Sequence, residues 1–267
     1  MALSPPDERE QYVAQFPALW GERVGVTHRT LVVGGARDDS GLLDALQALG
    51  RQEPPIAPGA NNLIAGALAA WFALVVLLGA NGAFVRPPGT APLPIFIGFA
   101  VPIAVFLVVY WFSSAFRALV LGLDLRLATA IQAWRLAGLG FIALYTYGVL
   151  PGLFALPAGL GDIAIGLTAP WVMRALERRP AFVASKGFVV WNLLGILDLL
   201  IAVGTGTTSS LLAVGAAGEI TMAPMAELPL VLIPAFLVPI FIMLHVAALI
   251  QARRFAGSGD RRESATR

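Results

Sequence analysis

Residues 132–173 read QAWRLAGLGFIALYTYGVLPGLFALPAGLGDIAIGLTAPWVM. The stretch divides into two apolar segments of about twenty residues each, the length that a helix needs to cross a hydrocarbon core of about 30 Å. A tight turn joins them at Val149-Leu150-Pro151-Gly152. This pattern predicts a transmembrane helical hairpin around which further helices pack.

The whole chain has the composition of a helical membrane protein. Of its 267 residues, 58% are hydrophobic and 13% are charged, whereas soluble domains carry about 25% charged residues. The apolar segments predict an all-α, polytopic membrane protein built as a bundle of six transmembrane helices. The predicted spans are residues 63–80, 93–112, 131–150, 153–173, 187–204 and 228–250.

The spans define one transmembrane domain at residues 62–252, between an N-terminal extension (1–61) and a basic tail (253–267). The extension contains too little apolar sequence to fold alone, so we expect it to be partly disordered. Eleven basic residues lie in the tail and in the connections after spans two and four, but only Arg86 lies in the other three connections. The positive-inside rule therefore places both termini in the cytoplasm.

Two further features concern location and topology. Seventeen Arg against a single Lys, with abundant Ala and Gly, is typical of a GC-rich bacterial genome. We therefore predict a bacterial inner membrane location. Residues 209–217 are apolar but too short to cross, so they form either a re-entrant segment or a loop that lies on the bundle.

Two acidic residues stand inside the apolar segments. A helical rise of about 1.5 Å per residue places Asp162 about 13 Å from the outer end of span four, and Asp198 about 17 Å from the inner end of span five. Both depths are close to the bilayer midplane. Gly159 and Gly166 flank Asp162 at helical spacing, and Gly195 precedes Asp198, which predicts a helix-packing seam and not a lipid-facing surface.

A carboxylate inside a membrane costs several kcal/mol, which makes Asp162 and Asp198 functional candidates. Two carboxylates that face one another do not both ionise easily, so the pair can take up and release a proton. A proton-coupled transporter or a small-cation site needs such a pair. The structural alternative is a protonated Asp, or an Asp bonded to Tyr145, Asn192 or a backbone carbonyl. Tyr145 is predicted at the same depth, as a hydrogen-bond partner of the aspartates in the proton or substrate pathway.

Arg135, Asn192 and His245 are predicted to form an inner vestibule of the same pathway. Arg135 lies about 6 Å inside the inner end of span three. Its long side chain is expected to reach the cytoplasmic headgroups; the alternative is a counter-charge or an anion ligand. A lone His such as His245 is more often an interhelical hydrogen-bond partner than a metal ligand, and Asn192 lies at a suitable depth.

One motif resembles a known family. Gly159-Leu160-Gly161-Asp162 is similar to the Gly-x-Gly-Asp signature of intramembrane aspartyl proteases of the presenilin and prepilin-peptidase type. Leu228-Pro229-Leu230 also looks like the Pro-Ala-Leu element of presenilins. The resemblance implies that Asp162 and Asp198 form a catalytic dyad. It departs in order, because the partner Asp precedes the motif in that family and Asp198 follows it.

The leading functional prediction is movement of a small solute or ion, coupled to protons through the midplane carboxylates, and it leans away from an enzyme. The alternatives are an intramembrane aspartyl protease and a non-catalytic membrane scaffold whose N-terminal segment or basic loop contacts a partner or anionic lipid. The absence of cysteine excludes disulfides and thiol catalysis. The expected partners are the lipid bilayer, a small solute or proton, and a second copy of the chain; we expect no metal, other cofactor or nucleic acid.

Overall fold

The computed structural model describes residues 60–264, which contain helices and connecting turns but no strand. Within this part of the chain, six stretches are long and apolar enough to cross a membrane. The predicted six-helix, all-α architecture is thereby confirmed, and it indicates a multi-pass membrane protein. Most of the predicted N-terminal extension, residues 1–59, lies outside the described residues. The six stretches are Asn62–Ala80, Leu93–Phe112, Leu125–Thr146, Gly152–Arg178, Lys186–Leu212 and Ile233–Ala256.

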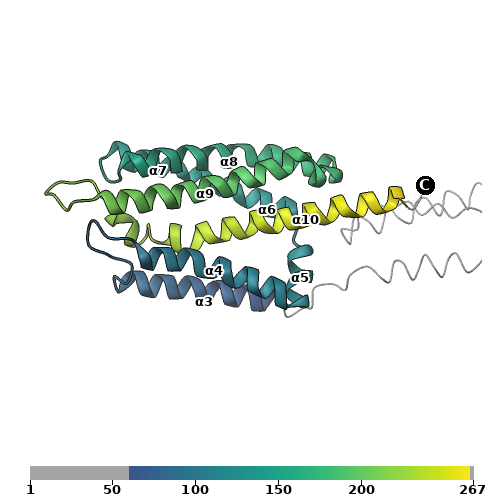
Figure 1. Cartoon of the computed structure of the whole chain (residues 1–267), viewed down its shortest axis with the longest axis horizontal. Helices are drawn as coiled ribbons and strands as arrows, with labels where there is room; N and C mark the ends of the chain where they lie inside the picture. Colours follow the sequence, from purple (N-terminus) through teal and green to yellow (C-terminus); the bar gives the residue numbers. More distant parts are fainter. Residues whose placement is uncertain (1–59, 265–267) are drawn as a thin grey trace, which may run out of the picture. The chain divides into compact units, whose positions relative to one another are not determined.

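The helices α8 (Gly152–Arg178) and α9 (Lys186–Leu212) pack side by side, and α10 (Val238–Ser264) lies between this pair and α4 (Leu93–Phe112) (Figure 1). The helix α3 (Ala60–Ala80) lies at the α4 side of the bundle and has few buried residues. Its aromatic side chains Trp71 and Phe72 pack on Phe236.

The third span differs most from its prediction. It consists of α6 (Leu125–Ile131), the 3₁₀ segment η1 (Gln132–Gly138) and α7 (Leu139–Thr146). Residues 113–130 were predicted as a loop, and that prediction is wrong because two side-chain caps start helices there. Ser113 accepts a hydrogen bond from the Phe116 amide at 3.2 Å and begins α5 (Ser114–Leu121). Asp124 accepts one from the Arg126 amide at 2.8 Å and begins α6.

The last two spans also have different limits. The helix α9 continues to Leu212 instead of ending at residue 204, so part of the 209–217 segment is helical. The connection that follows is closed by the Glu219 carboxylate, which accepts hydrogen bonds from the amides of Val214, Gly215 and Ala216. The π-helical segment η4 (Ile233–Leu237) leads into α10, which continues through much of the predicted tail.

The distribution of polarity is that of a protein surrounded by lipid. Large apolar side chains on the spans, such as Ile97, Trp111 and Leu160, are more than half exposed. Several polar and charged side chains are buried in the interior, among the apolar residues of the core. The buried polar and charged residues among those described are Thr129, Gln132, Arg135, Asn192, Ser209 and His245.

Candidate functional site: a buried charge cluster beside an apolar cavity

Arg135 lies at the centre of the bundle and is only 2% exposed. It stands on η1, ten residues after the start of α6. At rises of about 1.5 to 2 Å per residue, that distance is about 15 to 20 Å, half of a bilayer core. The predicted shallow depth and headgroup contact of Arg135 are therefore wrong, because its span begins earlier than the apolar run suggested.

The Arg135 guanidinium binds both membrane aspartates. Its Nε donates a hydrogen bond to Asp162 Oδ1 at 2.7 Å, and its Nη2 donates to Asp198 Oδ2. Its Nη1 donates to the Gly195 carbonyl at 3.2 Å. The structure thus gives Arg135 the counter-charge role, which was the alternative interpretation of this residue. The two carboxylates share one cation, an arrangement that differs from the proton-sharing dyad that the protease resemblance implies.

A hydrogen-bond chain assigns the protonation of His245. Asn192 Nδ2 donates to the Phe188 carbonyl at 2.9 Å, which leaves Asn192 Oδ1 as an acceptor. His245 Nδ1 lies 2.9 Å from that oxygen and is therefore the protonated ring nitrogen. His245 Nε2, 3.3 Å from Arg135 Nη1, accepts from the guanidinium. His245 is a neutral imidazole in this arrangement, and the predicted Asn192–His245 partnership is present.

Glycines allow the cluster to form by letting elements approach closely. A Cβ on Gly161 would collide with the Asp198 carboxylate, and one on Gly195 would collide with the His245 ring. A Cβ on Gly166 would lie 2.6 Å from the Leu136 amide nitrogen, and one on Gly159 would lie 2.9 Å from the carbonyl of η1's last residue. The glycines of α8 and α9 thus let the Asp198 and His245 side chains and the η1 backbone lie directly against these helices.

The charges of the cluster do not balance. One guanidinium faces two carboxylates, and His245 is neutral by its hydrogen bonds. With both carboxylates ionised, the cluster carries a net charge of about −1 in a region of low dielectric constant. The Arg135 side chain is inaccessible, while the Asp162 and Asp198 side chains remain 15% and 13% exposed. The groups that an incoming proton or cation can reach are the carboxylates.

Tyr145 does not join this cluster. It lies next to the last residue of α7, and its ring packs against the backbone of Gly152 at the start of α8. The side chain is 42% exposed. The prediction that Tyr145 bonds to an aspartate at the midplane is wrong for the same reason as the Arg135 depth, since the span lies earlier in the sequence than predicted.

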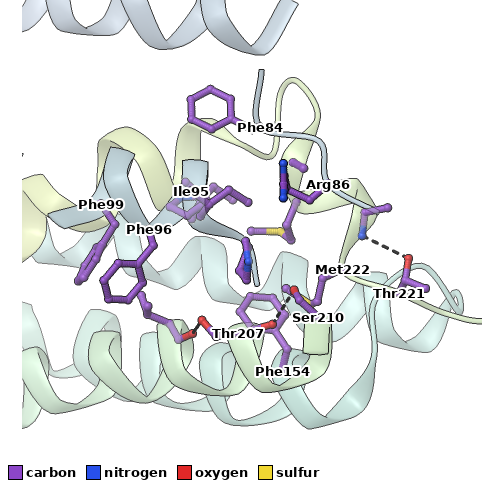
Figure 2. Close-up of a pocket in the computed structure, with 18 of the residues that line it drawn as sticks. Phe84, Arg86, Ile95, Phe96, Phe99, Phe154, Thr207, Ser210, Thr221 and Met222 are labelled. Atoms are coloured by element: carbon purple, nitrogen blue, oxygen red, sulfur yellow. Dashed lines mark hydrogen bonds between the residues drawn. The ribbon is translucent and has the colours of Figure 1, made fainter. Parts of the chain in front are cut away.

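An apolar cavity of about 160 Å³ reaches Asp162 of the cluster. It extends from the end of the bundle that carries the α3–α4 connection and the connection between α9 and the 3₁₀ segment η3 (Ala223–Ala226) (Figure 2). Asp162 lies in its wall, together with the buried rings of Phe99, Phe141 and Phe154. Arg86, on the α3–α4 connection, is exposed and lines the cavity. The cavity gives the Asp162 carboxylate a route to one end of the bundle.

Sequence reasoning missed several residues that shape the site. The Trp191 ring packs edge-on against His245 with centroids 5.4 Å apart, and its Nε1 donates to Thr168 Oγ1 at 2.9 Å. Gln132, the first residue of η1, is buried, and its side-chain amide donates a hydrogen bond to the Phe241 carbonyl. The available signal was the capping pattern at Asp124, which starts the third span at Leu125 and places Gln132 and Arg135 deeper within it.

Residues 92–253 match the family described as "Domain of unknown function (DUF8737)". The match covers more than half of the chain, and this protein belongs to that family. It includes α4 through most of α10, and thus the whole charge cluster, but not α3. Comparisons with curated proteins and with solved structures found no match.

Proposed function

We propose that this protein moves a small solute across a membrane and couples that movement to a proton carried by Asp162 and Asp198. The observation that carries the proposal is a cavity that reaches a buried cluster with one more carboxylate than cation. An uncompensated charge at this depth is costly, so a proton or a bound cation that neutralises it is favoured.

Arg135 compensates only one of the two carboxylate charges, so the cluster has room for one proton. Each aspartate receives one hydrogen bond from the guanidinium, which stabilises its ionised form. A proton that binds one carboxylate oxygen leaves a neutral Arg–Asp pair with the other carboxylate. The cluster therefore has two charge states that differ by one proton. The neutral state is the one that a low-dielectric environment favours while the bundle changes shape.

Two irregular helical segments flank the site and provide places for the bundle to change shape. The 3₁₀ segment η1 carries Arg135, and the π-helical η4 lines the cavity through Ile233 and Pro234. Such interruptions are frequent at hinges and functional sites in helices. Alternating access in transporters uses broken helices next to a midplane site, and these segments suit that role.

The proposed location is a bacterial inner membrane with both termini in the cytoplasm. The connection between α8 and α9 is basic, with Arg178, Arg179 and Lys186, and the positive-inside rule assigns it to the cytoplasm. The cavity lies among the connections at the other end of the same helices, so it would open to the outer side.

Pyranine-filled proteoliposomes test the proposal. Amino acids, sugars, carboxylic acids and amines are added in turn while internal pH is followed. We expect at least one class to change internal pH in the wild type and not in Asp198→Asn, which retains a neutral Arg135–Asp162 pair and should still fold. Asp124→Asn is the matched control, because it changes a half-exposed carboxylate outside the cluster and keeps a capping side chain. Equal pH changes in the wild type and Asp198→Asn, or none with any class, would refute the proposal.

A further inference from the structure

The cavity wall offers a particular chemistry. Its charged residues are Asp162, beside the buried cluster, and Arg86, on an exposed connection. Because Arg86 is exposed to solvent, we infer the chemical class of the ligand from the buried groups that line the cavity. Besides aliphatic side chains, the lining contains Asp162, phenylalanine rings and hydroxyl groups, which present negative charge or electron density to the space.

Phenylalanine rings supply the first part of this chemistry. Phe99, Phe141 and Phe154 line the cavity with Asp162, and all three are buried. The Phe141 and Phe154 rings pack edge-to-face at 5.2 Å. Aromatic faces attract ammonium groups through the ring quadrupole, most strongly where water is excluded. A carboxylate beside several rings is the usual composition of a site for an organic cation with an apolar body.

Hydroxyl groups supply the second part. Thr207 Oγ1 donates its proton to the Val203 carbonyl at 2.8 Å, and Ser210 Oγ donates to the Gly206 carbonyl at 3.0 Å. Both residues line the cavity (Figure 2). Because a hydroxyl has a single proton, these oxygens have only acceptor capacity left for a ligand. They match the N–H donors of an ammonium group and not the oxygens of a carboxylate or phosphate.

The charge of the cluster supplies the third part. Arg135 on η1 contacts Asp162 on α8, Asp198 on α9 and His245 on α10. These groups together carry about one negative charge when both carboxylates are ionised. A monovalent cation in the cavity would balance it. A proton on Asp162 or Asp198 would balance it equally well, so the two would exclude one another.

We propose that the cavity binds a small organic ammonium cation with an apolar body, in competition with a proton at the Asp162–Asp198 cluster. This inference rests on the proposed function and gives it a substrate class and a direction of coupling: the cation moves against the proton. Each cation bound releases one proton from the cluster, and no covalent step is involved.

Isothermal titration of the full-length protein with benzylammonium, and with the matched neutral and anionic compounds benzyl alcohol and benzoate, tests the inference. We expect benzylammonium to bind at least tenfold more tightly than either analogue, and its affinity to fall by up to tenfold per pH unit on acidification, as a single competing proton requires. Asp198→Asn should lose at least tenfold in affinity. Phe154→Leu, which removes a ring and keeps an apolar side chain, should lose a few-fold.

Three outcomes would overturn the inference: equal affinity for benzyl alcohol, unchanged affinity in Asp198→Asn, or affinity that does not depend on pH. The liposome assay separates this failure from failure of the proposed function. If sugars or carboxylic acids change internal pH and amines do not, transport stands and the cation class is wrong. If no class changes it, both proposals fall.

Discussion

Substitution of Arg135 by Gln is the most informative perturbation of this protein. The guanidinium is the shared partner of Asp162 and Asp198, and it also contacts His245 and a backbone carbonyl. Gln is shorter and uncharged, so both carboxylates lose their counter-charge inside the bundle. The change removes a central group of the cluster while leaving the apolar packing of α8 and α9 in place.

The size of the effect follows from the burial of the three side chains. Removing one partner of a buried ion pair costs about 3–5 kcal/mol, because the remaining charge stays uncompensated. Here two carboxylates are left, so we expect the upper part of that range at neutral pH. Acidification should return part of the loss, since protonation removes the charge that the substitution leaves uncompensated, and the deficit should grow as the pH rises.

The measurement is the free energy of unfolding of the purified protein in mixed micelles, obtained by titration with SDS and followed by circular dichroism. The matched control is the triple variant Arg135→Gln, Asp162→Asn, Asp198→Asn, which has no charge to compensate and should recover most of the stability. Arg135→Lys should lie between, because an ammonium keeps the charge but lacks the fork that reaches four groups. If Arg135→Gln is within about 1 kcal/mol of the wild type, or the triple variant is no more stable than it, the reasoning is wrong.

Further predictions concern packing and topology. Gly195→Ala should cost about 1–3 kcal/mol in the same unfolding assay, because its methyl group would collide with the rigid His245 ring, whereas Gly204→Ala on the same helix meets open space and should be neutral or stabilising. Similar losses in both variants would contradict the close approach. Ala184→Cys and Ala217→Cys lie on exposed connections at opposite ends of α9 in a chain without cysteine. In intact cells an impermeant maleimide should label position 217 and not 184; the reverse pattern would invert the proposed orientation.

The sequence was sufficient for the fold class. Six runs of apolar residues are a property of composition and length alone, and each overlaps one of the six membrane-length helical stretches among the described residues. The positions of Asp162 and Asp198 within their helices were also predictable, because α8 and α9 start at clear signals, the Pro151-Gly152 turn and the Ser185 cap. A constant rise per residue then gives the depth in each helix.

The sequence was insufficient where a helix start did not coincide with an apolar run. Residues 114–130 carry enough charge to read as a loop, but the cap at Asp124 begins the third span there. That shift moves Arg135 from the predicted membrane surface to the bundle centre and Tyr145 from the centre to a helix end. Hydropathy averages over a window, whereas a cap acts through a single hydrogen bond.

Only the tertiary structure decided which polar groups meet. Asp162, Asp198, Arg135 and His245 lie on four different spans, and their pairing depends on the rotation of each helix about its axis and on glycines that let side chains and backbone approach closely. The residue pattern of one helix does not specify how a neighbouring helix is rotated about its own axis. Composition and periodicity therefore determined that this chain carries charged residues inside an apolar helical bundle. Packing determined that two carboxylates share a single guanidinium beside an apolar cavity.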